Sequence, residues 1–129
     1  MKHLCLLSLL FFCGTTFAGK SVILREPVYT LHKAFPIEDV SKSLEYALIT
    51  KRWKITKHEG NVIHAFLHAR THSAKIRIEY GSDKYQIFYE DSTNLKFRIK
   101  ENRRYIHHNY MRWIDLIDLE TQKYLVEHQ

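Results

Sequence analysis

Histidines are the side chains of this sequence best suited to chemistry, and three of them recur at every fourth position. His64, His68 and His72 have the spacing that would place metal ligands on one face of a helix. On a strand, four residues span about 13 Å, whereas imidazole nitrogens that share a zinc ion lie about 2 Å from it. A strand therefore disfavours a site shared by these three. A metal site that combines His64 or His68 with His107 or His108 stays open.

A hydrolase is a second chemical possibility. Ser92 could serve as a nucleophile, with His107 or His72 as its base and Asp91 to orient that base. The sequence has no glycine-flanked nucleophile turn and no glycine-rich oxyanion loop to support this chemistry. It also has no phosphate-binding loop or dinucleotide fingerprint, so no cofactor is expected. A hydrolase or a histidine-based metal protein is therefore the alternative, and a non-enzymatic binding protein is favoured.

The candidate binding residues lie where the last long strand is expected to end and a second helix to begin. They are His72, Tyr89, Asp91, Ser92, His107, Tyr110 and Trp113. Tyr110 and Trp113, three residues apart on an apolar helix face, also suit a hydrophobic core. His107 also suits a hydrogen-bonded clasp between helix and loop.

Three successive runs between Val62 and Glu90 alternate apolar and polar residues with the period of a strand. One face would carry Ile63, Ala65, Leu67, Ala74, Ile76, Ile78, Tyr80, Tyr85, Ile87 and Tyr89. The other face is mostly polar, as expected for an antiparallel sheet with one side in water. We expect this polar face to meet an anionic envelope component or a protein partner through His64, His68, Arg70, Lys75 and Arg77.

Helical spacing flanks these runs on both sides. It predicts one helix from Ile37 to about Arg52 and a second from Ile106 onward. The segment 53–57 would be the first strand, turns would follow at 59–61 and 81–83, and residues 95–99 could add a short strand. The predicted fold is α+β, an antiparallel four-stranded meander covered on one face by N- and C-terminal helices, in the order α-β-β-β-β-α. Residues 37–129 would form this single domain, with 19–36 as an extended arm or short edge strand.

The first 18 residues have the features of a secretory signal. Lys2 and His3 precede the apolar run Leu4–Phe12, and Thr16-Phe17-Ala18 supplies small residues for cleavage after Ala18. We therefore expect export, to the periplasm or the medium, and no transmembrane helix. A lipid anchor at Cys13 is disfavoured because the bulky Phe12 precedes it.

Composition allows an anionic partner without requiring one. The formal net charge is +6, and loss of Lys2 with the signal would leave 19 basic and 14 acidic residues, a net charge of +5. This modest excess favours anionic surfaces. Nucleic acid is not expected, because the basic residues are interleaved with acidic ones and the cluster Lys100–Arg104 has the character of a solvated turn.

The stretch from His107 to Trp113 and the residues before it resemble a family of small bacterial exported proteins and lipoproteins of uncharacterised function. The resemblance covers about Leu44 to Leu125, and its most specific part is the stretch from His107 to Trp113, which is similar to His-Arg-Asn-Tyr-Asn-Arg-Trp. Three positions depart from the family pattern: His108, Met111 and Arg52, the last where relatives tend to have glycine. The resemblance implies a location in the bacterial envelope and leaves the function open.

Overall fold

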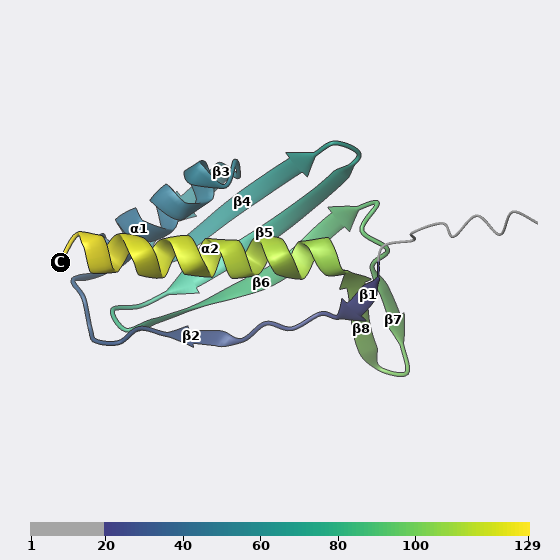
Figure 1. The fold of residues 1–129 in the computed structure, drawn as a ribbon, viewed down its shortest axis with the longest axis horizontal. Helices are drawn as coiled ribbons and strands as arrows, with labels where there is room; N and C mark the ends of the chain where they lie inside the picture. The colour runs from purple at the N-terminus through teal and green to yellow at the C-terminus, as the bar shows by residue number, and fades with distance from the viewer. Residues whose placement is uncertain (1–19) are drawn as a thin grey trace, which may run out of the picture.

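The computed structural model describes residues 20–129, and the expected signal sequence, with Cys5 and Cys13, lies outside them. Two short strands, β1 (Ser21–Ile23) and β2 (Val28–Thr30), precede helix α1 (Ile37–Thr50). Six strands follow: β3 (Lys54–Glu59), β4 (Val62–Ala69), β5 (His72–Tyr80), β6 (Lys84–Thr93), β7 (Arg98–Lys100) and β8 (Arg103–His107). Helix α2 (His108–Glu127) ends the described chain (Figure 1). Neither helix of this part of the chain is long and apolar enough to cross a membrane.

The main sheet has five antiparallel strands in the order β2-β6-β5-β4-β3. Its register places apolar residues opposite one another, as in the row Ile63, Ile78 and Ile87. The α+β class and the antiparallel meander are therefore confirmed, with β3 to β6 as the meander. The four-stranded description was incomplete, because β2 pairs with β6 and adds a fifth strand.

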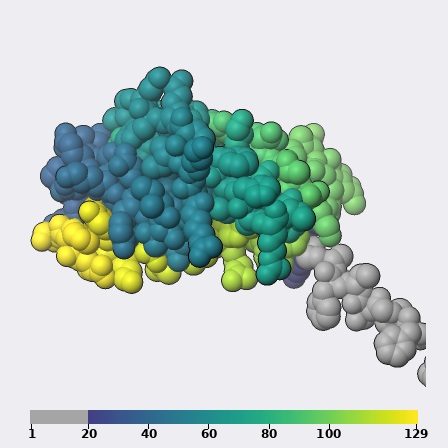
Figure 2. Space-filling view, turned by 90° about the horizontal axis from the view of Figure 1, so that it is seen from above, coloured from purple at the N-terminus to yellow at the C-terminus, as the bar shows by residue number. Residues whose placement is uncertain are grey.

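Both helices cover the same face of this sheet (Figure 1). Their apolar stripes, which include Leu44 and Leu48 on α1 and Ile114 and Ile117 on α2, are buried against the inward residues of the strands. Figure 2 shows the C-terminal end of α2 beside the start of α1. Phe35, just before α1, and Leu125 of α2 line a common hollow there. The face of the main sheet turned away from the helices is called the uncovered face below.

A second sheet of three strands, β1-β8-β7, lies at the other end of the molecule (Figure 1). The short strand expected in 95–99 therefore does not extend the meander. Asn94 and Lys96 both have positive φ (59° and 54°), so the chain turns away after β6. The turn expected at Lys100–Arg104 is present, as a two-residue β7–β8 loop in which Glu101 and Asn102 have the positive φ of a type I′ turn.

Two further boundaries differ from expectation. Ile106 belongs to β8, and α2 begins at His108, because the side chain of His107 accepts a hydrogen bond from the backbone N–H of Asn109 and caps the helix. The segment 19–36 was expected as an extended arm or a short edge strand, and β2 is such an edge strand of the main sheet, whereas β1 of the second sheet was not expected. Between those strands, Glu26 pairs with Arg104 of β8 and accepts a hydrogen bond from the backbone N–H of Tyr89 in β6.

Candidate functional site

Three of the candidate binding residues meet beneath the start of α2. The hydroxyl groups of Tyr89 and Ser92 are 2.7 Å apart, and the ring of Tyr89 contacts that of Tyr110 edge-on, with centroids 5.6 Å apart. Burial raises the pKa of both tyrosines above its ordinary value, so both hydroxyls remain neutral. Tyr110 is 1% exposed. These contacts make the group part of the core.

His107 lies beside this group and is the N-cap of α2. Its Nδ1 accepts the N–H of Asn109 at 3.1 Å, and an N-cap of this kind stabilises a helix by about 0.5–2 kcal/mol. Its ring is stacked on His108 (4.6 Å between centroids) and lies 5.9 Å from the ring of His72. Burial, and then the charges of His108, His72 and Lys96, lower the pKa of His107. The imidazole is therefore held neutral.

The polar side chains considered for a hydrolase are engaged in other hydrogen bonds. Asp91 lies opposite Lys75 on the uncovered face, because a bulge at this point of β6 shifts the register. Ser92 is bonded to Tyr89, and Nδ1 of His72 lies 2.8 Å from the carbonyl oxygen of Asn94. Within residues 20–129 there is also no group of three potential metal ligands close enough to share an ion.

On the uncovered face, acidic and basic side chains form ion pairs with one another. Glu90 lies 3.3 Å from Nδ1 of His64 and 3.6 Å from the guanidinium of Arg77, and Arg77 also reaches Glu79 at 3.6 Å. The same guanidinium lies over the ring of Phe88, 4.3 Å from its centroid. Arg77, a member of the predicted basic set, is thus already paired within the sheet.

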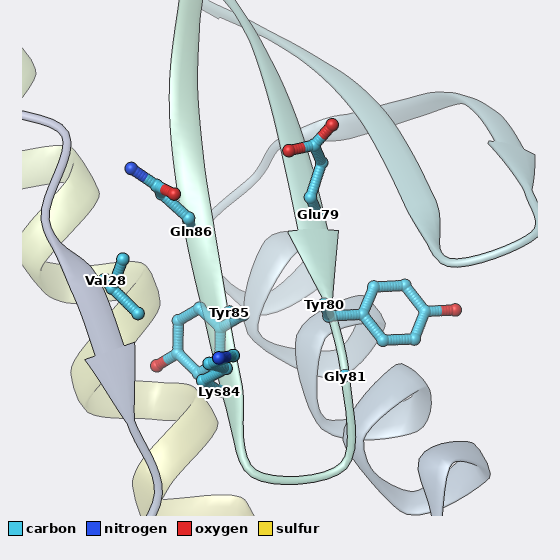
Figure 3. A pocket seen from close by; sticks show the side chains of 7 residues that line it. All are labelled: Val28, Glu79, Tyr80, Gly81, Lys84, Tyr85 and Gln86. Atoms are coloured by element: carbon cyan, nitrogen blue, oxygen red, sulfur yellow. The ribbon is translucent and has the colours of Figure 1, made fainter.

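A hollow of about 360 Å³ lies at the β5–β6 hairpin, at one end of this sheet. Figure 3 shows the side chains around it, among them Glu79 on β5, Lys84 and Gln86 on β6 and Val28 on β2. It is open to solvent, and its two charged residues have opposite signs. It therefore offers no preference for either charge.

A second hollow, of about 370 Å³, combines positive charge with apolar walls. Its basic residues are Lys51, Arg52, His68 and Arg70. Its other residues are Trp53, Leu67, Ala69, Trp113 and Leu116. We call it the tryptophan–arginine pocket. No acidic residue lines it, and its volume falls within the range of small-molecule sites.

The unequal lengths of the helices create this pocket. Helix α1 has 14 residues and α2 has 20, a difference of about 9 Å at 1.5 Å per residue. Tyr46 contacts Tyr124 and Lys51 pairs with Glu120, so the first part of α2 extends past the end of α1. The end of the sheet nearest the β4–β5 turn is therefore roofed by α2 alone.

The two arginines of the pocket have unusual backbone conformations. Arg52 (φ 68°) follows the end of α1, where hydrogen bonds from Arg52 N to Ile49 O (3.0 Å) and from Trp53 N to Leu48 O (2.8 Å) form a Schellman motif. Arg70 (φ 57°) is the first residue of the two-residue β4–β5 loop. Glycine is the favoured residue at both kinds of position. Such strained residues concentrate at functional sites.

Arg52 and Arg70 are also the free charges of the pocket. Lys51 is paired with Glu120 at 3.5 Å. Neither arginine makes an ion pair with any of the residues 20–129, and both are exposed. The C-terminal dipole of α1 accounts for cations at 51 and 52. It does not account for Arg70, which comes from a different element.

Sequence reasoning identified only part of this pocket. Trp113, Arg70 and His68 were among the expected partner-binding residues, on the second helix and the polar face, whereas Arg52 and Trp53 were not. The structure also brings together Glu45, His58 and Tyr80, with the imidazole 2.7 Å from each partner, which fastens α1 and β3 to β5.

Acid is expected to destabilise the protein through His107. The unfolded chain binds a proton at the ordinary pKa of 6.5, whereas folded His107 does so only at lower pH. Between these values the unfolded state holds more protons, so stability falls as the pH drops below about 6.5. In His107→Asn the amide oxygen keeps the cap but cannot titrate. Thermal melts from pH 7.5 to 4.5 should show a flatter dependence for this variant, and His32→Asn, at an exposed position, is the control. The same slope in His107→Asn and in the unmodified protein would contradict the assignment.

Comparisons with protein-family models, with curated proteins and with solved structures find no match to this chain.

Proposed function

We propose that this protein is a non-enzymatic binding module of the bacterial envelope, and that it holds an anionic ligand in the tryptophan–arginine pocket. The observation that carries the proposal is the pair of free, strained arginines at one concave site without an acidic residue. Guanidinium groups suit carboxylate and phosphate oxygens, which they bind through paired hydrogen bonds.

Two of the polar residues considered for catalysis, Ser92 and His107, have structural hydrogen bonds instead. The hydroxyl of Ser92 is hydrogen-bonded to the hydroxyl of Tyr89, and Nδ1 of His107 accepts a hydrogen bond from the backbone N–H of Asn109 at the start of α2. Each has a structural task, and neither lines the pocket. The envelope location rests on the signal-like N-terminus and on the family resemblance.

Tryptophan fluorescence tests the proposal directly, because the only two tryptophans of the chain, Trp53 and Trp113, both line the pocket. We expect inorganic phosphate, added at constant ionic strength, to change the emission saturably. Hydrogen bonds to charged groups contribute about 1.5–3 kcal/mol each. Arg52→Gly with Arg70→Gly should therefore weaken phosphate binding by about 100-fold or more.

The same double variant should keep its stability, which separates loss of binding from loss of fold. Glycine adopts positive φ without the strain of a side chain, so the melting temperature should hold or rise. Lys96→Gly is the matched control, since Lys96 also has positive φ (54°) but lies outside the pocket. Absence of saturable phosphate binding, or equal affinity in the double variant and the unmodified protein, would refute the proposal.

A further inference from the structure

We infer that the ligand of the tryptophan–arginine pocket is a single-chain anionic amphiphile, with a phosphate or carboxylate head group and an alkyl chain. This inference rests on the proposed function and narrows it to one chemical class. It follows from the way in which charge, apolar surface and exposure are arranged within the pocket.

The pocket has a buried apolar floor and an exposed cationic rim. Trp53 and Leu67 are 3% and 6% exposed, so they form the floor. Arg52 and Arg70 are exposed, so they lie at the rim. A hydrophilic anion such as free phosphate would use only the rim. An amphiphile matches both parts, with its head group on the arginines and its chain against the floor.

Leu116 and Trp113 supply an apolar wall on α2. Both are half-buried, and Leu116 lines the pocket together with Lys51 and Arg52, which follow the end of α1. With α1 already ended, this leucine leaves part of its surface open to the pocket. Burial of apolar area is the main source of affinity for an alkyl chain. The hollow at the β5–β6 hairpin also has apolar and aromatic lining, from Val28, Tyr80 and Tyr85. It differs in charge, because Glu79 and Lys84 have opposite signs.

Decyl phosphate, used below its micellar concentration, is the probe that tests this inference. Each buried methylene tightens binding about fourfold, so burial of four methylenes predicts binding more than about 100-fold tighter than that of inorganic phosphate. Tryptophan emission of the full exported chain reports both titrations. Decyl phosphate binding no more than about threefold tighter than phosphate would overturn the inference.

Two neighbouring leucines on α2 provide a matched pair of variants. Leu116→Gln should weaken decyl phosphate by about tenfold or more while phosphate binding is unchanged, which also shows that the variant is folded. Leu119→Gln should leave both affinities unchanged, because Leu119 is 60% exposed and lies outside the pocket. Equal effects of the two substitutions on decyl phosphate would overturn the inference.

Vesicles distinguish a free amphiphile from a lipid in a bilayer. We expect phosphatidylglycerol vesicles to leave the emission unchanged at lipid concentrations where monomeric decyl phosphate saturates it. Sedimentation of the protein with the vesicles, dependent on Arg52 and Arg70 but not on Leu116, would overturn the inference in favour of a bilayer surface. Arginine-dependent phosphate binding without tighter decyl phosphate binding refutes the amphiphile alone. Absence of saturable phosphate binding refutes the proposed function, and the inference with it.

Discussion

Tyr85→Ala is expected to lower the free energy of unfolding by about 3–5 kcal/mol, the range for removing a large aromatic side chain from a core. Tyr85 is 1% exposed near the start of β6, between Tyr29 of β2 and Tyr80 of β5. Its hydroxyl donates a hydrogen bond to the carboxylate of Asp118 on α2. Burial, and then the hydrogen bond to Asp118, raise the pKa of Tyr85. The substitution therefore removes packing and a charge-assisted contact between sheet and helix. Urea denaturation followed by circular dichroism measures the loss.

Two phenylalanine variants separate the hydrogen bond from the packing. Tyr85→Phe should lower the free energy of unfolding by about 1–3 kcal/mol, because the carboxylate of Asp118 loses the nearer of its two donors and keeps only Gln122, at 3.3 Å. Tyr29 stacks on Tyr85, with centroids 5.3 Å apart, but its buried hydroxyl has no hydrogen-bond partner among residues 20–129. Burial, and then the charges of Asp115 and Asp118, raise the pKa of Tyr29 to about 12. Tyr29→Phe should therefore cost nothing, and equal losses in the two phenylalanine variants would contradict this account.

Glu26→Ala is expected to lower the free energy of unfolding by about 2–3 kcal/mol, because it leaves the half-buried backbone N–H of Tyr89 without an acceptor. One carboxylate oxygen accepts the backbone N–H of Tyr89 at 2.8 Å, where β6 is bulged, and the other pairs with Arg104 of the second sheet. The side chain of Arg104 is 38% exposed and can be hydrated, so most of the loss comes from the amide of Tyr89. Chemical denaturation gives the total loss, and hydrogen exchange at the Tyr89 amide shows where it arises.

The conservative variant identifies which contact matters. Glu26→Gln keeps a neutral oxygen for the Tyr89 amide and should lose less than half of what alanine loses. Arg104→Ala should also lose less than Glu26→Ala, because the hydrogen bond to Tyr89 remains. A larger loss in Arg104→Ala than in Glu26→Ala would mean that the ion pair, rather than the amide contact, joins the two sheets.

Long periodic segments of the sequence determine the part of the fold that could be predicted. Strands β4, β5 and β6 alternate over eight to ten residues each, and the apolar positions of α1 recur at helical spacing. A change of register by one residue would expose every apolar side chain of such a strand, so the pattern leaves little choice. The observed β4 (Val62–Ala69) and α1 (Ile37–Thr50) accordingly lie close to their predicted ranges.

Short strands could not be predicted in the same way. β1, β2 and β7 have three residues each, too few to show a period. Their pairing depends on contacts with segments far away in the sequence. The start of α2 was misplaced because Ile106 fits the helical period, and only the cap at His107 shows that the helix begins later.

The pocket illustrates a similar limit for function. Its residues come from three segments around positions 51–53, 67–70 and 113–116, and no spacing within one segment indicates that they meet. The sequence alone assigned no role to Leu116. The structure gives it one, at the point where α1 ends and α2 continues.

The pairing of β1 with β8 affects the order in which the two sheets can fold. Ser21 of β1 lies opposite His107 of β8. The first strand of the described chain therefore has no partner until the last strand has been synthesised. Contacts between such distant positions carry a large loop-closure entropy and slow the folding reaction. The meander β3 to β6 joins neighbours through short turns and can form first. We therefore expect the second sheet to form last, when β1 pairs with β8.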